Sequence, residues 1–185
     1  SVDRLDKIKL EGIYSFSVSE VENLFLDEEF LKKLGESLLC DEAKIILIKE
    51  DVIKELDKEK DLQISNYIST KINNIFTDTD LTKGNTIEKV KENYELFLNA
   101  IDIESFYNQR KTEIEEIIAS NNYPQAISVF NNKGLKKIAS RHLSITDFTE
   151  RCFKFLQSKP ENLDLLKKYF PSEIIALQAL RAIVY

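Results

Sequence analysis

Glycine and proline are scarce in this sequence, and their scarcity limits the folds that the chain can adopt. Only four glycines and three prolines occur among 185 residues, well below the roughly 12% that these two residues contribute to average proteins. Tight turns depend on them, so a chain this poor in both is unsuited to a β-sandwich or barrel with many short strands. Hydrophobic residues make up 43% and charged residues 31%, the balance of a protein with a packed core. The composition therefore predicts one domain that is mainly helical.

The first 35 residues differ from the rest of the chain. A short β-prone run, Ile13 to Ser17, follows Gly12 and predicts a strand, and Val2 is placed at the end of a preceding strand. We therefore expect mainly α structure with a small N-terminal α/β portion, a partial parallel sheet, in residues 1–35. Residues 36–185 are expected to form a helical C-terminal tail of the same domain. Because the chain opens on Ser1 and contains no methionine, we expect it to be the later part of a larger protein.

Helical periodicity dominates from about Asp41 onward. Apolar side chains recur three and four residues apart, which is the spacing of one face of an α-helix. Three such stripes are Ile45, Ile48, Val52 and Leu56, then Ile64, Ile68, Ile72 and Phe76, then Ile87, Val90, Tyr94, Phe97 and Ile101. Turn residues between 77 and 85 predict a loop. The last third predicts shorter helices, one from near Pro124 to Phe130 and others over 135–142, 146–157, 161–169 and 172–183.

No segment indicates a membrane protein or an exported one. No apolar run approaches the roughly 18–20 residues of a membrane span, and no signal-peptide pattern opens the chain. Cys40 and Cys152 are the only cysteines, and their spacing fits neither a disulfide framework nor a metal-binding pair. The sequence therefore predicts a cytoplasmic protein that has no membrane partner and uses its cysteines as small hydrophobes.

The charge balance limits the nucleic-acid partners of the chain. With 26 basic and 32 acidic side chains the net charge is −6, which argues against broad, nonspecific binding of nucleic acid. A local cluster of Lys133, Lys136, Lys137 and Arg141 is nevertheless basic. We expect Lys133, Lys136 and Arg141 to contact phosphate if a nucleic acid is a partner.

Enzyme motifs are few. There is no phosphate-binding loop, no dinucleotide-binding glycine pattern and no nucleophile elbow. His142 is the only histidine, and its lysine-rich helical setting favours a structural role. The remaining candidates are carboxylates near the predicted strand ends: Asp3 after the first strand, Glu20 and Glu22 after the second. Ligands gather at C-terminal strand ends in α/β sheets, so these groups could hold Mg²⁺ and activate water for phosphodiester cleavage.

The same glutamates also fit a structural interpretation. Ser17 to Glu20 and Ser19 to Glu22 both match the capping box S-x-x-E. In that motif the glutamate closes a helix N-terminus and binds no metal. The local pattern leaves both interpretations open.

Two short motifs carry a resemblance to a known family. Glu20-Val-Glu-Asn-Leu-Phe-Leu26 follows the predicted strand, and Val2-Asp3-Arg4 precedes it. Together with the segment from Phe130 to Leu135, these residues resemble the Toprim-like domain that accompanies AAA/ABC-type ATPases in bacterial defence proteins. That family is related to the overcoming-lysogenisation-defect nucleases, and its motifs run V-D-R-D, then a G-I strand, then E-V/I-E-N-L/Y-F/L.

The resemblance implies a metal-dependent nuclease that takes part in anti-phage defence. It implies Asp3, Glu20 and Glu22 as catalytic residues, Asp3 and Glu22 as ligands of Mg²⁺ or Mn²⁺, and Asn23 as a support of the turn. ATP would be bound only by an ATPase domain or subunit outside this chain, and nucleic acid would be the substrate. We expect the 185 residues to be inactive alone.

The alternative hypothesis is a non-catalytic helical interaction module that docks an ATPase or another protein. It predicts an exposed apolar patch and carboxylates that point apart. The aromatic residues that could supply this patch are Phe148, Phe153, Phe155, Tyr169 and Phe170.

Overall fold

The computed structural model describes residues 18–79 and 84–170 of the chain. These residues form nine α-helices and two short 3₁₀ helices, and they contain no strand. The prediction of a mainly helical chain is therefore confirmed. The helices divide into two compact units, one built from the described residues before Asp57 and after Glu116, the other from Asp57–Glu116.

The N-terminal α/β portion is not seen in the part of the chain that the structure describes. From Val21 to Ser37 the chain is helical, with η1 (Val21–Leu26) followed by α2 (Glu28–Ser37). A tight 3₁₀ turn buries four consecutive side chains here, from Asn23 to Leu26, which a strand with alternating faces would not do. Val2 and the predicted strand Ile13 to Ser17 lie outside the described residues.

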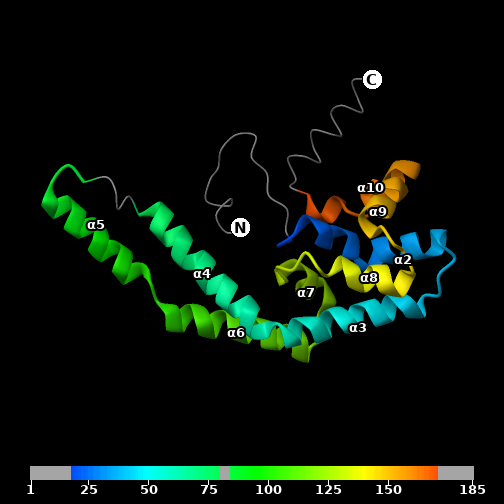
Figure 1. Ribbon diagram of the computed structural model, residues 1–185, viewed down its shortest axis with the longest axis horizontal. Coiled ribbons are helices and arrows are strands. Elements are labelled where there is room, and N and C mark those ends of the chain that lie inside the picture. Colours follow the sequence, from blue (N-terminus) through cyan, green and yellow to red (C-terminus); the bar gives the residue numbers. More distant parts are fainter. Residues whose placement is uncertain (1–17, 80–83, 171–185) are drawn as a thin grey trace, which may run out of the picture. The chain divides into compact units, whose positions relative to one another are not determined.

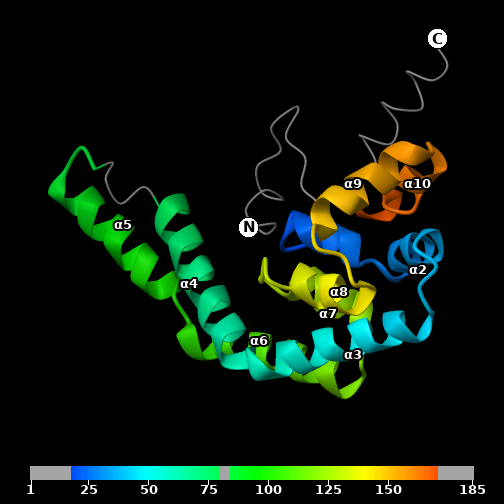
Figure 2. The same ribbon diagram turned by 45° about the vertical axis from the view of Figure 1, so that its right-hand side comes forward.

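The first unit contains helices from both ends of the chain. Its elements are η1, α2, most of α3 (Ala43–Lys58), the end of α6 (Ile103–Ala119), α7 (Tyr123–Val129), α8 (Lys136–Leu143), α9 (Phe148–Ser158), α10 (Glu161–Asp164) and η2 (Lys167–Tyr169). The short η1 contacts α2, α7, α8 and α9 and so lies at the centre of this unit (Figure 1; Figure 2).

Aromatic side chains fill much of the core around η1. The Phe25 ring lies 5.6 Å from the Phe30 ring and 5.2 Å from the Phe153 ring, and Phe30 also meets Phe155 at 5.5 Å. The α3 stripe predicted from its spacing, Ile45, Ile48, Val52 and Leu56, is fully buried. This part of the chain thus has an ordinary hydrophobic core.

Side-chain caps explain where several helices begin. Asp27 accepts a hydrogen bond of 3.1 Å from the Phe30 amide at the start of α2. Asn122, Asp147 and Thr86 cap α7, α9 and α5 in the same way. Such caps satisfy amides that have no partner within the helix.

Three of the five helices predicted in the last third are confirmed. α7, α8 and α9 lie within two residues of their predicted bounds. The predicted helix 161–169 is split into α10 and η2, while the predicted helix 172–183 lies outside the described residues. Among the described helices, none combines the length and the hydrophobicity that a membrane crossing requires.

The second unit is a three-helix arm. It consists of α4 (Lys60–Asp78), α5 (Ile87–Ala100) and the first part of α6. α4 and α5 run antiparallel (Figure 1; Figure 2), with the Phe76 and Phe97 rings 5.9 Å apart. The first half of α4 meets α6 instead, where the Tyr67 hydroxyl and Gln109 Oε1 are 3.2 Å apart. α4 extends to Asp78, two residues into the segment predicted as a loop.

Candidate functional site

Asn23 lies within the motif Glu20 to Leu26, on which the family resemblance depends. Its side chain is almost completely buried, with 1% of the residue surface exposed. Its Nδ2 donates hydrogen bonds of 2.9 Å to the Ile127 carbonyl and 2.8 Å to the Phe130 carbonyl. Both acceptors belong to the C-terminal end of α7. Asn23 Oδ1 is buried without a hydrogen-bond partner, so the side chain acts through its amide donors. The contact ties η1 to α7 across more than a hundred residues.

The candidate metal ligands are not brought together in the described residues. Glu22 Oε1 lies 3.5 Å from Lys136 Nζ, so this carboxylate is paired with a lysine. Glu20 is the N-cap residue of η1 but its side chain makes no capping bond, and Asp3 lies outside the described residues. Across residues 18–79 and 84–170, no group of three or more His, Cys, Asp or Glu side chains is placed to hold a metal ion.

The capping box at Ser19 does not form either. Both the amide and the hydroxyl of Ser19 donate to the Ser128 carbonyl, at 2.9 Å and 2.8 Å. Glu22, its expected partner, is occupied by Lys136. Ser19 therefore helps to attach η1 to α7, and Ser17 lies outside the described residues.

Two of the three candidate phosphate-binding residues are engaged by carboxylates. Lys136 pairs with Glu22, and an Arg141 guanidinium nitrogen lies 2.7 Å from Asp51 Oδ2. Lys133 is exposed in the turn before α8. Part of the positive charge of this cluster is thus neutralised by neighbouring acids.

His142 takes part in an ion-pair network between α3 and α8. Its Nε2 lies 2.8 Å from Asp51 Oδ2, and Lys54 Nζ lies 3.3 Å from the other oxygen of the same carboxylate. The hydrogen bond from His142 lowers the pKa of Asp51 below its usual value, and Lys54 acts in the same direction. This arrangement favours the structural role expected for His142.

Asp27 is a buried acid that the sequence did not identify as a site residue. It is 3% exposed, caps α2, and accepts a hydrogen bond of 2.9 Å from the Tyr169 hydroxyl. Lys168 Nζ lies 2.7 Å from the same oxygen. The available signal was the position of an aspartate directly before a helix, but its partner Tyr169 is 142 residues away along the chain.

A hollow of about 440 Å³ lies at the junction of α8 and α9. Charged side chains of α9 line one part of it, including Glu150 and Lys154. These two are paired with each other at 2.5 Å, and Asp147 is occupied as the α9 cap. Three of the four charged side chains that line the hollow are therefore used within α9 or at its cap, and Arg151 is the fourth.

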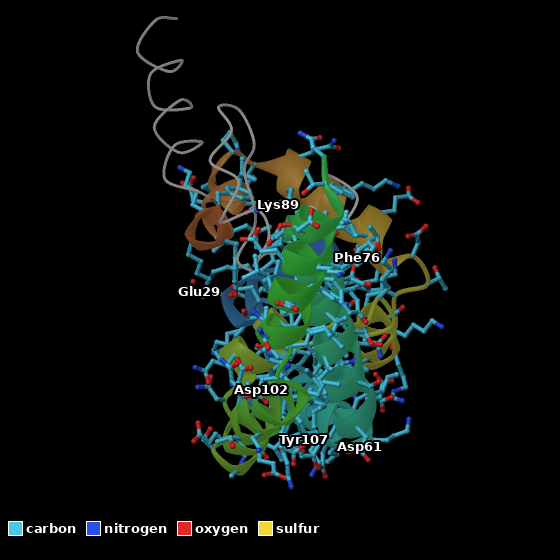
Figure 3. The ribbon with its side chains drawn as sticks, turned by 90° about the vertical axis from the view of Figure 1, so that its left-hand side faces the viewer. Glu29, Asp61, Phe76, Lys89, Asp102 and Tyr107 are labelled. Atoms are coloured by element: carbon cyan, nitrogen blue, oxygen red, sulfur yellow. The ribbon has the colours of Figure 1, made fainter. Side chains whose placement is uncertain are left out.

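The second unit exposes most of its apolar side chains. Of the 25 buried apolar residues found among the described positions, only Ile64 and Ile114 belong to this unit. Nine of the 14 exposed large apolar residues do: Leu62, Phe76, Ile87, Val90, Tyr94, Leu96, Leu98, Ile103 and Tyr107. In Figure 3, Phe76 and Lys89 are labelled in the upper part of the view and Tyr107 and Asp61 in the lower part. Exposed apolar residues thus occur along the whole arm.

Four of these residues form a continuous row, which we name the α5 stripe: Ile87, Val90, Tyr94 and Leu98. Their spacing of three, four and four residues places them on one face of α5. Their exposed fractions are 61%, 38%, 55% and 49%. The sequence predicts most of this row as a helix face, and all four side chains are exposed in the structure. By contrast, the aromatic patch expected near the C-terminus is not formed, because Phe148 is buried and Phe153 alone of that set is largely exposed.

Comparison with known proteins gives no relative. No family model, no curated protein and no solved structure matches this chain. Residues 18–79 and 84–170 are all-helical apart from their loops, and the Toprim-like resemblance stays a prediction.

Proposed function

We propose that this chain works as a helical protein-interaction module whose binding surface is the α4–α5 arm. The observation that carries this proposal is the contrast between the two units. Nearly all buried apolar side chains belong to the first unit, while most exposed ones belong to the second. Proteins rarely leave large contiguous apolar patches in water unless the patch binds something.

The composition of α4 supports the same function. Between Leu62 and Thr77 the one charged residue is Lys71, although charged residues make up 31% of the chain. A surface that has few charged residues and is rich in aromatic and aliphatic ones is typical of the centre of a protein–protein interface. A merely solvent-exposed helix would be expected to carry charges on its outer face.

The charge of the arm favours a protein partner over a nucleic acid. From Asp57 to Glu116 there are eight basic and thirteen acidic residues. This excess of negative charge would repel a phosphate backbone. An ATPase domain or subunit, the partner that the sequence resemblance implies, belongs to the class of partner that this surface fits.

A matched pair of substitutions tests the proposal. Tyr94→Glu places a charge in the α5 stripe, and Ile46→Glu does the same on α3 in the first unit, where the exposed fraction is nearly equal at 56% against 55%. Each of the three proteins is immobilised, and the proteins that it captures are quantified. We expect the wild type and Ile46→Glu to retain the same partner in a stoichiometric amount. Tyr94→Glu should lose it. Equal capture by all three proteins would mean that the arm is not the binding surface.

A second candidate is the Mg²⁺- or Mn²⁺-dependent nuclease of anti-phage defence that the resemblance implies, with ATP bound by a separate ATPase. Its Toprim-like sheet would fall within residues 1–17, and its residues would be Asp3, Glu20 and Glu22. The observation that favours it is the rigid attachment of the motif, since the buried Asn23 amide fixes the turn that carries Glu22. Catalytic groups need such positioning.

Metal binding separates the two candidates. Titration with Mn²⁺, followed by its electron paramagnetic resonance signal, should give a bound ion that Glu22→Gln and Asp3→Asn each weaken if the nuclease hypothesis holds. Glu36→Gln changes an exposed acid of α2 and serves as the control. Absence of saturable binding would remove the catalytic role of these acids.

A further inference from the structure

We infer that the α5 stripe binds a second copy of this chain, so that two arms associate antiparallel about a two-fold axis. This inference deepens the proposed interaction function and rests on it. A two-fold contact requires a surface that is complementary to itself. The spacing of the α5 stripe and the charges on its flank meet that requirement.

The first argument is the symmetry of the stripe. Its ends are Ile87 and Leu98, and its midpoint falls between Glu92 and Asn93. When two such helices lie antiparallel with a two-fold axis at this midpoint, Ile87 of each copy meets Leu98 of the other. Val90 and Tyr94 then lie in the central part of the contact, where aromatic anchors contribute most to binding. The spacing 87, 90, 94 is also the a, d, a pattern of a helix-pairing seam.

The second argument is charge complementarity on one flank of the stripe. Lys91 and Glu95 are both exposed. Viewed down the helix axis, both lie on the same side of Tyr94, because an α-helix has 3.6 residues per turn. They therefore flank the α5 stripe on one side. A two-fold axis near Asn93 places Lys91 of one copy opposite Glu95 of the other. The same operation places Glu95 opposite Lys91, so two equivalent ion pairs form.

The third argument is that the segment formed by α4, α5 and their connection is nearly neutral. From Lys60 to Ala100 it has five basic and six acidic residues. The two helices that would form the contact therefore add little mutual repulsion of their own, although the arm as a whole, Asp57–Glu116, has eight basic and thirteen acidic residues. A strongly charged partner would find few opposite charges on α4, which carries only Lys71 between Leu62 and Thr77.

The expected affinity is moderate. A contact between two short helices is at the low end of the roughly 1,200–2,000 Å² that stable complexes bury. We expect a monomer–dimer equilibrium with a dissociation constant on the order of micromolar. Sedimentation equilibrium of the full 185-residue chain between about 1 and 200 μM covers this range.

Three variants test the geometry. Tyr94→Glu should weaken dimerisation at least about 30-fold, because loss of a central aromatic anchor is worth about 2 kcal/mol or more. Ile46→Glu, the matched control on α3, should leave the constant unchanged. Lys91→Glu should weaken association by about 3- to 10-fold through like-charge contacts, and the double swap Lys91→Glu with Glu95→Lys should restore it. Circular dichroism of each variant verifies that helix content is kept.

The outcomes separate this inference from the proposed function. Concentration-dependent dimers that Tyr94→Glu abolishes and the double swap restores support the inference. A chain that stays monomeric to 200 μM overturns it, as do dimers unaffected by Tyr94→Glu. If such a monomer still retains another protein through Tyr94, the self-association fails but the interaction function stands. If the monomer retains no other protein, both the self-association and the interaction function are wrong.

Discussion

The hydroxyl of Tyr169 donates a 2.9 Å hydrogen bond to the buried carboxylate of Asp27, although the two residues are 142 positions apart. Asp27 simultaneously caps α2 through the Phe30 amide and pairs with Lys168. One carboxylate therefore joins the start of α2 to η2. Because the acceptor of these bonds is a buried carboxylate, each bond is stronger than a hydrogen bond between two neutral groups.

Removing the Tyr169 hydroxyl should destabilise the first unit. Tyr169→Phe leaves the ring in place and removes one bond to a charged acceptor, so we expect a loss of about 1–2 kcal/mol in the free energy of unfolding by urea. Tyr107→Phe, at a 37% exposed phenol, should change it by less than about 0.5 kcal/mol. A double-mutant cycle with Asp27→Ala measures the coupling directly. Additive effects would mean that the two side chains do not interact in solution.

The buried phenols should make the protein sensitive to alkali. Burial and the Asp27 carboxylate raise the pKa of Tyr169, and burial raises the pKa of Tyr123, both above their usual value of 10.0. The unfolded chain therefore releases these protons near pH 10 while the folded chain keeps them, so stability is retained below about pH 10 and falls as the pH rises above it. Urea unfolding at pH 8 and pH 11 measures this fall. Tyr169→Phe should reduce its size, and an equal fall in both proteins would contradict the assignment.

Loss of the Asn23 amide should be more costly. Asn23→Ala leaves the Ile127 and Phe130 carbonyls without their buried donor, and we expect a loss of about 2–4 kcal/mol. Asn99→Ala on the exposed side of α5 is the control and should be nearly neutral. The measurement is the urea concentration at the midpoint of unfolding, compared between proteins whose free energy of unfolding has the same dependence on urea. A small effect of Asn23→Ala would show that water replaces the amide.

The Asp51 network should add stability at neutral pH that disappears in acid. His142 and Lys54 lower the pKa of Asp51, so its contribution is present above the unfolded value of about 3.8 and is lost as the pH falls through the lower folded value. Asp51→Asn should therefore cost about 0.5–1 kcal/mol at pH 7, since the group is partly exposed. The difference from the wild type should shrink as the pH falls below 3.8. Asp57→Asn, which changes an exposed acid near the end of α3, serves as the control variant.

Hydrogen exchange should distinguish the two units. The arm has two fully buried apolar side chains among its described residues, so its amides should exchange through low-energy local openings. Amides of α2 and the first turns of α3, beside buried Phe30 and Ile48, should be protected at least about 100-fold more. Mass spectrometry of peptides from α4 and α5 gives the comparison. Equal protection in both units would indicate a core that the described contacts do not include.

The local pattern predicted helices well but not what they pack against. The α3 stripe from Ile45 to Leu56 was predicted from spacing alone, and it is buried. The α5 row has equally regular spacing, yet Tyr94 is exposed. Periodicity reports that a helix has an apolar face, but it does not report whether the same chain supplies the partner for that face.

Long-range contacts account for what was missed around the motif. Ser19 was a candidate helix cap, but it donates to Ser128. The local pattern also did not indicate that Glu22 pairs with Lys136, and the metal-binding role of Glu22 remains a prediction. Both partners lie more than a hundred residues away, so no window of local sequence contains them. The Asp27 contact to Tyr169 was missed for the same reason. The prediction for Asp3 remains untested, because that residue lies outside the described part of the chain.

The separation of Asn23 from its acceptors has a consequence for synthesis on the ribosome. Ile127 and Phe130 lie 104 and 107 residues after it. At about 5–20 residues per second, translation needs roughly 5–20 s to reach them. During that time η1 emerges with Leu24, Phe25 and Leu26 uncovered, since α7, α8 and α9 do not yet exist. The nascent chain therefore exposes an apolar segment of the kind that chaperones bind, and the first unit cannot finish folding before Phe130 has been synthesised.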